Sequence, residues 1–323
     1  KVQQSNALHD YPDHRPEPDR RHRKNACHGR TRTKRTICLP AGRPALTDYC
    51  VKNLITRTIT GIFFVAIIIG SMLLHPLSFA CVIFVIMVYG LLEFFRIVKT
   101  DQIFPQQIAG IFFGSIAYLL PVIAASGIIS PKFLALMPLL IIFIFITELY
   151  RKKPNAMQNV AFTIFPIAYI SIPLATLVLL MSPLVSGEYA HWHILFGFFI
   201  ISWSYDTFAY LTGMLLGKHK FFERISPKKT WEGTIGGTVF GLVAAYVLSV
   251  FFVELNAVQW IMAGLIIIVA GTFGDLSESL FKRMYNVKDS GNFFPGHGGV
   301  LDRFDSVLFA APAMFCYLIL LNL

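Results

Sequence analysis

The sequence predicts an all-α, polytopic integral membrane protein with about nine transmembrane helices. Two observations carry this prediction. The 323 residues are 55% hydrophobic with a mean hydropathy of +0.61, and only 14% of them are charged, whereas a soluble domain has about 25% charged residues. The apolar residues also gather in runs near the roughly 20 residues that an α-helix needs to cross a bilayer.

Residues 1–50 differ from the rest of the chain. They carry 11 Lys/Arg against 5 Asp/Glu, are rich in His and Pro, and show no hydrophobic period. This composition predicts a disordered basic segment, and the lack of an apolar run before Val51 argues against a signal peptide. We hypothesise that residues 1–50 are not native and that the working protein starts near Val51. Peptides from residues 1–50 in mass spectrometry of the native protein would contradict this.

Residues 51–323 are predicted to form one membrane-embedded domain, because they contain no internal repeat and no long linker. Nine apolar segments divide it, at about 58–74, 77–95, 104–125, 132–150, 159–181, 192–216, 233–253, 258–276 and 304–322. The first two segments are joined at His75-Pro76, which predicts a helical hairpin.

The basic residues predict the orientation in the membrane. If the N-terminus is cytoplasmic, the cytoplasmic segments hold sixteen of the Lys/Arg in residues 51–323, and the outer segments hold only Lys132. Lys and Arg are enriched in the cytoplasmic loops of membrane proteins. We therefore expect a cytoplasmic N-terminus, an outer C-terminus and cytoplasmic charged loops in the C-terminal half. Cations beside spans favour anionic lipid or a nucleotide as partner over nucleic acid.

The densest polar run is Ser277–Asp305, in the half of the chain, about 200–323, where we place catalysis. Two predicted helix ends there present polar faces at helical spacing. One carries Asp275, Glu278, Ser279 and Lys282, and the other carries Asp302, Asp305 and Ser306. Carboxylates on a polar face suit a hard cation such as Mg²⁺, and the glycines between them allow close backbone approach to phosphates. This combination is typical of metal-assisted phosphoryl chemistry.

Single charged pairs in this run could also have a structural role without function. Asp302-Arg303 and Glu278-Lys282 could be ordinary ion pairs at the membrane interface. Likewise, His297 could donate to a phosphate or could be a plain loop residue. The concentration of charge on an otherwise charge-poor chain favours function for the run as a whole, because charged groups beside spans are costly.

Two further polar features lie upstream. Asp206 sits inside the sixth apolar segment, so we expect it to line a water-filled site or to bond to a neighbouring helix. The loop Ser226–Gly233 enters the seventh segment, where Lys228 and Lys229 could hold phosphates and Thr230 could cap the following helix. The five cysteines have no CxxC spacing and two of them lie in apolar segments, which argues against a zinc site or a disulfide framework.

The run SLFKRMYNVKDSGNFFPGHGGVLDRFDS resembles the signature of the phosphatidate cytidylyltransferase family, also called CDP-diacylglycerol synthases. Its matching parts are Ser279, Lys282-Arg283, Lys288-Asp289, Ser290, Pro295–Gly299 and the Asp302-Arg303-x-Asp305 end. The segments around Asp206 and Ser226–Gly233 are similar to other polar segments of the family. The resemblance covers about residues 52–323.

The resemblance implies an enzyme that converts CTP and phosphatidate into CDP-diacylglycerol and pyrophosphate. It implies a multi-span, often dimeric protein with Mg²⁺ between Asp275 and Asp302. Glu278 and Asp305 would orient these metal ligands. A second cation, monovalent or divalent, is compatible with the resemblance. The expected catalytic residues are Asp275, Asp302, Lys282, Arg283, Lys288, Arg303 and His297. The expected substrate-binding residues are Asp206, Ser226, Lys228, Lys229, Thr230, Ser279, Asp289, Gly296, Gly298 and Gly299.

We therefore expect the lipid phosphate to attack the α-phosphorus of CTP. The reaction would take place at the cytoplasmic face of a bacterial inner membrane, and no nucleic acid would take part. Lysines and arginines would bring the two anionic substrates together. One alternative is a CTP-dependent lipid kinase, which would transfer the γ-phosphate. A secondary transporter is another, but transporters place polar breaks in paired repeats, whereas these charges cluster in one half of the chain.

Overall fold

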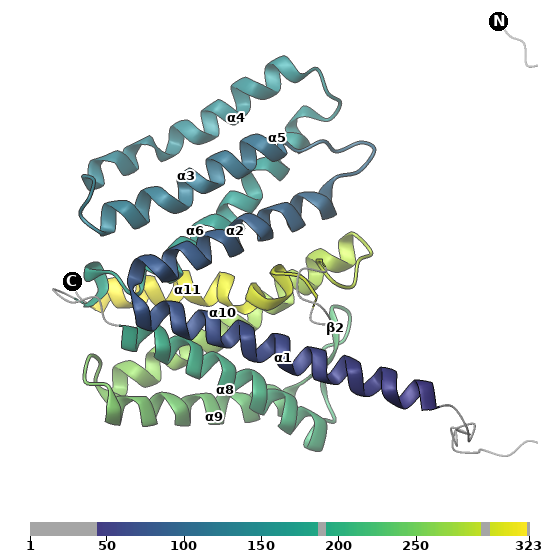
Figure 1. The fold of residues 1–323 in the computed structure, drawn as a ribbon, viewed down its shortest axis with the longest axis vertical. Helices are drawn as coiled ribbons and strands as arrows, with labels where there is room; N and C mark the ends of the chain where they lie inside the picture. Colours follow the sequence, from purple (N-terminus) through teal and green to yellow (C-terminus); the bar gives the residue numbers. More distant parts are fainter. Residues whose placement is uncertain (1–43, 187–191, 292–297, 322–323) are drawn as a thin grey trace, which may run out of the picture. The chain divides into compact units, whose positions relative to one another are not determined.

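A computed structural model of the chain describes residues 44–186, 192–291 and 298–321, with side chains from Thr58 onward. The described part is almost entirely helical, which confirms the predicted all-α class (Figure 1). The elements are α1 (Pro44–Leu74), α2 (Pro76–Val98), α3 (Gln107–Ala125), η1 (Pro131–Leu136), α4 (Met137–Arg151), α5 (Ala156–Pro166), η2 (Ile167–Ser171), α6 (Ile172–Leu179), α7 (Pro183–Ser186), α8 (Trp192–Leu216), β1 (Lys220–Phe222), β2 (Ser226–Thr230), α9 (Trp231–Phe251), α10 (Ala257–Met284) and α11 (Leu301–Leu321).

The predicted membrane segments correspond to these helices. Within the described residues, eight helical stretches are long and apolar enough to cross a membrane, and Thr58–Leu74 is a shorter apolar helix. Residues 47–323 form one compact unit. Helix α1 begins at Pro44, so residues 44–50 of the predicted disordered segment are helical, while residues 1–43 lie outside the described part. The predicted apolar segment ends near residue 276, but helix α10 continues to Met284. The acidic stripe from Asp275 to Lys282 therefore lies on α10.

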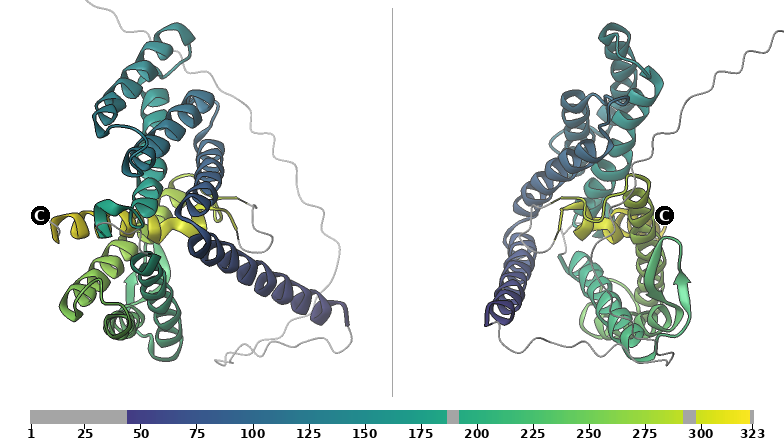
Figure 2. Two further views of the ribbon diagram at one scale, coloured as in Figure 1. Left: turned by 60° about the vertical axis from the view of Figure 1, so that its left-hand side comes forward. Right: turned by 90° about the vertical axis from the view of Figure 1, so that its right-hand side faces the viewer.

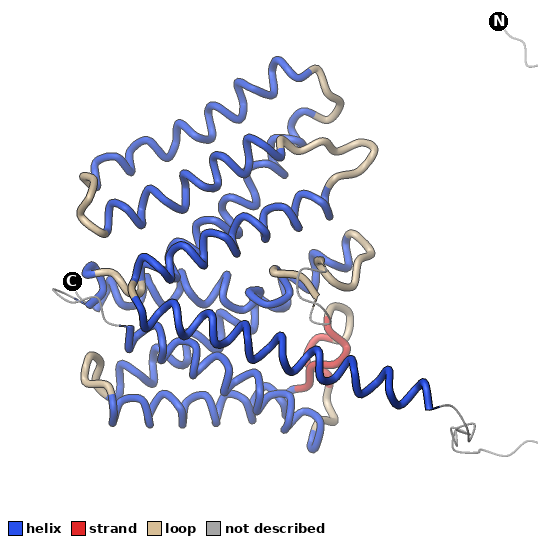
Figure 3. Tube along the Cα trace, viewed as in Figure 1, coloured by secondary structure: helices blue, strands red, loops and turns tan. Residues whose placement is uncertain are grey.

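The loops that were predicted to be cytoplasmic all lie at one end of the helices. Residues 99–106, 152–155 and 217–230 and the described parts of 285–300 are found on the right in Figure 1, and the connections 126–136 and 252–256 on the left. Figure 3 shows the strands β1 and β2 at the right-hand end, where they form an antiparallel hairpin between α8 and α9. The fold therefore gathers the charged loops of distant segments at one surface.

Helices α8 and α9 pack closely because small residues line their contact. Gly233, Gly237 and Gly241 recur every four residues on the buried face of α9. A Cβ atom at Gly237 would lie 2.7 Å from the Cβ of Ala209 on α8, so only glycine permits this separation. Small residues serve this purpose in membrane helices, where packing rather than hydrophobicity drives association.

Helices α10 and α11 also pack closely, and α11 lies at the centre of the domain. A Cβ atom at Gly274 would collide with the backbone carbonyl of Asp305. Figure 2 shows α11 (yellow) between the group α3–α6 and the group α8–α9. Phe304 and Met314 of α11 belong to one buried apolar cluster with Phe94 of α2 and Leu174 of α6. The helix that carries the predicted acidic end is therefore anchored from both halves of the chain.

Candidate active site

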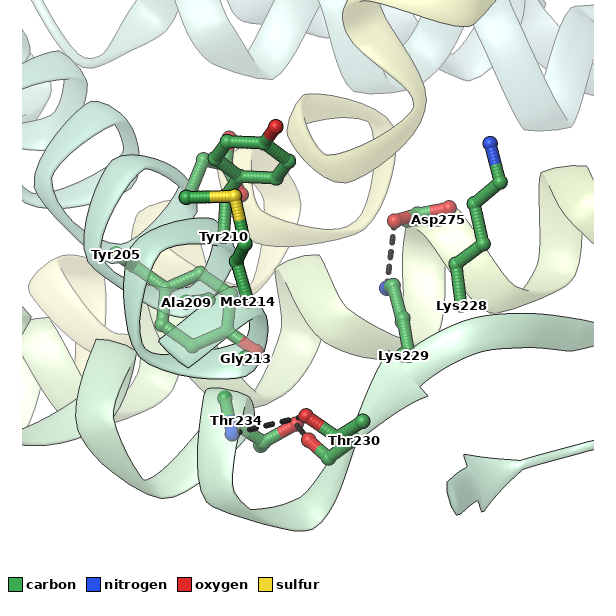
Figure 4. Close-up of a pocket in the computed structure, with 12 residues that line it drawn as sticks. Tyr205, Ala209, Tyr210, Gly213, Met214, Lys228, Lys229, Thr230, Thr234 and Asp275 are labelled. Atoms are coloured by element: carbon green, nitrogen blue, oxygen red, sulfur yellow. Dashed lines mark hydrogen bonds and ion pairs between the residues drawn. The ribbon is translucent and has the colours of Figure 1, made fainter. Parts of the chain in front are cut away.

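A cavity of about 320 Å³ opens between α8, β2, α9 and α10 (Figure 4). The two lysines of the loop Ser226–Gly233 line it, together with Asp275 of α10. Lys229 Nζ lies 2.5 Å from Asp275 Oδ2, and the Lys228 side chain extends beside this pair in Figure 4. The cavity thus combines two cations with the carboxylates of Asp275 and Asp206, as a site for a charged ligand requires.

Local structure fixes where these lysines point. They lie on β2, and α9 starts directly after it. Thr230 is the N-cap of α9, because its side chain accepts a hydrogen bond from the amide of Gly233 at 3.2 Å; this confirms the predicted cap. The Glu232 carboxylate accepts from the amides of Lys218 and His219, which ties the start of the β-hairpin to α9.

Asp206 lies on α8 and lines the same cavity as Asp275. Its carboxylate is within electrostatic range of both Asp275 and Lys229, and Asp305 of α11 is within range of Asp206 and Asp275. Three helices therefore contribute carboxylates to one region. Asp206 therefore lines a cavity, as the first of its two expected surroundings requires.

A second charged cluster joins α10 to α11. Lys282 Nζ lies 2.5 Å from Glu278 Oε2 and 2.8 Å from Asp302 Oδ1. The other oxygen of Asp302 accepts from the amides of Ser290 and Gly299, at 2.9 and 2.8 Å. Asp302 thus holds a lysine with one oxygen and the loop backbone with the other, and both acidic helix ends share Lys282.

Glu93, from the N-terminal half, completes this loop. It lies on α2, is 4% exposed, and accepts from the amides of Val300 and Leu301 at 3.0 and 3.1 Å. The hydroxyl of Ser290 also contacts it, at 3.2 Å. The first amides of a helix have no partner within the helix, and a carboxylate there is favoured by the helix dipole. Glu93 therefore caps α11, which carries Asp302.

The glycines of the loop are needed for these contacts. Gly298 has φ +83°, and a Cβ there would lie 2.6 Å from Asp302 Oδ2. At Gly299 a Cβ would lie 2.5 Å from Glu93 Oε2, and at Gly291 it would also collide with Glu93. The predicted role of these glycines was to let backbone approach phosphate; here they let it approach two carboxylates.

The remaining predicted site residues lie around these clusters. Ser279 Oγ contacts Asp275 Oδ1 at 3.3 Å, and Ser226 begins β2. Four charged residues have exposed side chains at the same end of the domain: Arg283, Lys288, Asp289 and Arg303. Gly296 and His297 lie outside the described residues. The structure thus brings Asp206, Lys229 and Asp275 together in one group, and Lys282, Glu278 and Asp302 in the other.

Known proteins with similar sequences show the family of this chain. A sequence profile of the cytidylyltransferase family matches residues 55–321. The chain belongs to this family. The match begins after the basic N-terminal segment and includes every predicted site residue.

Individual relatives agree with the profile. A phosphatidate cytidylyltransferase of Staphylococcus haemolyticus is 34% identical over 267 residues, covering 81% of this chain and 98% of the relative. One of Staphylococcus saprophyticus is 39% identical over 208 residues, covering 64% and 76%. One of Staphylococcus aureus strain COL is 41% identical over 170 residues, covering 52% and 62%.

The donor atoms in this cytidylyltransferase-family site suit Mg²⁺. Among the described residues no three His, Cys, Asp or Glu side chains form a metal cluster by themselves. Magnesium does not need one, because it keeps several waters and is bound by one or two carboxylates plus substrate phosphates. Asp275 faces the cavity, and one oxygen of the buried Glu278 has no hydrogen-bond partner in the described part. These oxygens fit a hard cation.

Glu93 is not among the predicted site residues. The signal was an ionisable residue inside the second apolar segment, where such residues mark functional or structural sites by default. Its partners are about 200 positions later in the chain, and no local spacing connects them. Only the packing of α2 near the start of α11 shows which groups the carboxylate serves.

Proposed function

We propose that this chain transfers the cytidylyl group of CTP to phosphatidate, giving CDP-diacylglycerol and pyrophosphate. The observation that carries the proposal is the pairing of each acidic helix end with a lysine: Lys229 with Asp275, and Lys282 with Asp302. Two anionic substrates need cations at two neighbouring points, and carboxylates hold those cations in place until phosphates arrive. The relatives' name and the long family match support the same reaction.

In this proposal the substrates supply the reacting groups. A phosphate oxygen of phosphatidate attacks the α-phosphorus of CTP, and the bond to the β-phosphate oxygen breaks to release pyrophosphate. Lys228 and Lys229 hold one phosphate chain in the cavity, and Lys282, which lies beside Glu278 and Asp302, holds the other anion. Arg283, Lys288 and Arg303 offset the charge at the exposed rim, as cations do in phosphoryl transfer. No protein nucleophile is required.

Asp275 and Asp302 would hold Mg²⁺, with Glu278 and Asp305 orienting them. When bound, such an ion supplies charge neutralisation at the phosphate oxygens. Asp206 and Asp305 would be the carboxylates available to a second cation. His297 would donate to a phosphate, and Gly296 with its neighbours would bring backbone amides to it.

We further propose a bacterial inner-membrane location with the site at the cytoplasmic face, and a homodimer. The placement of the charged loops at one end of the helices supports the orientation. A cytoplasmic site at the bilayer surface can reach a soluble nucleotide and a lipid head group together.

The test uses purified protein in detergent with radiolabelled CTP, phosphatidate and Mg²⁺, with and without EDTA. The expected result is label in a chloroform-soluble CDP-lipid, release of pyrophosphate, and loss of both with EDTA. Phospho-lipid with CDP as co-product would instead show a lipid kinase. Folded protein that makes neither product would contradict the proposal.

A further inference from the structure

A second cavity, of about 570 Å³, lies between the start of α3 and the end of α4. Among the described residues, it shares no lining residue with the cavity of the candidate active site. Two cations, Lys99 and Arg151, line it together with apolar side chains of α3, which include Ile108, Phe112 and Phe113. The cavity thus places positive charge next to an apolar surface in the N-terminal half of the chain.

A buried polar network holds Arg151 in place. Its Nη1 atom donates to Glu148 Oε2 at 2.7 Å and to the Phe104 carbonyl at 2.9 Å. Glu148 is 6% exposed and also accepts from Gln106 Nε2 and Asn159 Nδ2, at 2.6 and 2.9 Å. The Nε and Nη2 donors of Arg151 have no partner in the described part of the chain. The network therefore fixes a guanidinium at the cavity and leaves it donors for a ligand.

The charges around the cavity are mainly positive. The ammonium group of Lys99 is exposed and has no ion-pair partner within the described residues. Lys153 Nζ lies 5.4 Å from the centre of the Phe104 ring, and Phe104 also lines the cavity. Of the described residues that line the cavity, none is acidic, and Asp101 of the adjacent loop is not one of them. An anion is therefore the complementary ligand.

The apolar part of the cavity favours a lipid over a soluble anion. Ile108 is 87% exposed and Phe112, about one turn further along α3, is 59% exposed. On α4 only Ile144 and Glu148 are buried, so both helices present apolar side chains to the bilayer. The charged loops next to this cavity lie at the end of the helices where the other charged loops gather (Figure 1). Basic pockets between membrane helices bind lipid head groups.

We propose that this cavity binds one anionic phospholipid, separately from any lipid substrate. The lipid phosphate pairs with Lys99 and Arg151, and an acyl chain lies along Ile108 and Phe112. The order from cations to apolar side chains along α3 matches the order from head group to acyl chain in the lipid. The inference does not depend on the proposed cytidylyl transfer, because the two cavities are lined by different residues.

The test uses the purified full chain in nanodiscs of phosphatidylcholine with a small fraction of phosphatidylglycerol that carries a photoactivatable diazirine in its acyl chain. After irradiation, peptide mass spectrometry should locate label on α3 between Ile108 and Phe113. The same probe built on zwitterionic phosphatidylcholine should label these residues about tenfold less, as for loss of one hydrogen bond between charged groups.

Two variants change the cavity in different ways. Lys99→Gln removes a cation that has no partner in the described structure, and Ala109→Phe fills the cavity without a change of charge. Each should reduce the label on α3 about tenfold while the protein keeps its melting temperature. Lys152→Gln is the matched control, because Lys152 adjoins Arg151 but does not line the cavity, and it should keep the label.

Several outcomes would overturn the proposal. Equal labelling by the two lipids would show ordinary contact with the bilayer, and an equal loss in Lys152→Gln would show an effect of general surface charge. Full displacement of the label by inorganic phosphate would assign the cations to a soluble anion. Absence of label on α3 would be expected if a second copy of the chain covers the cavity. Specific labelling of a protein that makes no CDP-lipid would support this site and contradict only the proposed function.

Discussion

The carboxylate of Glu93 on α2 accepts a hydrogen bond from the backbone amide of Leu301, at the first turn of α11, across 3.1 Å. The same side chain binds the amide of Val300. One residue of the N-terminal half thus holds the helix end that carries Asp302, and the loop that precedes it.

Replacing Glu93 by Gln should damage both stability and activity. The amide group of Gln would place N–H donors against backbone N–H donors, and a buried unsatisfied group costs about 1–3 kcal/mol. We expect a lower melting temperature in detergent and a fall in kcat of about tenfold or more. Glu254→Gln, at the other end of the helices, should keep its activity. A Glu93→Gln enzyme with wild-type kcat would show that the cap does not position Asp302.

Lys229→Met should weaken substrate binding and turnover while the fold is kept. The lysine is within the cavity and pairs with Asp275. A hydrogen bond to a charged group contributes about 1.5–3 kcal/mol, so kcat/KM for CTP should fall about 10- to 100-fold. Lys220 lies on β1, outside the residues that line this cavity. Equal losses in Lys220→Met and Lys229→Met would mean that the effect is one of general surface charge.

Asp275→Asn and Asp302→Asn should each reduce kcat by orders of magnitude without unfolding the protein, because both remove an anionic ligand from the proposed magnesium site. The residual activity should need more Mg²⁺ for half-saturation. Melting curves and a Mg²⁺ titration of the initial rate measure the two effects. Asp101→Asn, in an exposed loop, is the control. Near wild-type turnover in either site variant would refute the metal assignment.

Gly298→Ala should lose more activity than Gly127→Ala, although both variants carry similar backbone strain. Gly298 and Gly127 both have positive φ, at +83° and +76°. A Cβ at Gly298 meets Asp302 Oδ2 at 2.6 Å, whereas at Gly127 nothing lies within 4 Å. Both alanines carry a left-handed cost of about 1–2 kcal/mol, but only Gly298→Ala displaces Asp302. Initial rates and melting temperatures of the two variants compare them, and equal losses of activity would contradict this.

Much of the candidate site was predictable because its residues are close in sequence. The stripe Asp275, Glu278 and Lys282 follows from helical spacing, and the Thr230 cap from its place before an apolar run. Glu93 was not predicted as a site residue, since it binds backbone amides about 200 positions away. The glycines were predicted for phosphate approach, but their contacts with Glu93 and Asp302 depend on how α2 and α11 pack.

The sequence by itself determined the all-α membrane class, the succession of apolar segments and the family, because hydrophobic length and a long local motif are properties of the chain order. Only the tertiary structure decided which carboxylate pairs with which lysine, and that the N-terminal half holds the end of α11. Contacts between α2, η2, α10 and α11 arise from close packing of helices, which local spacing does not specify.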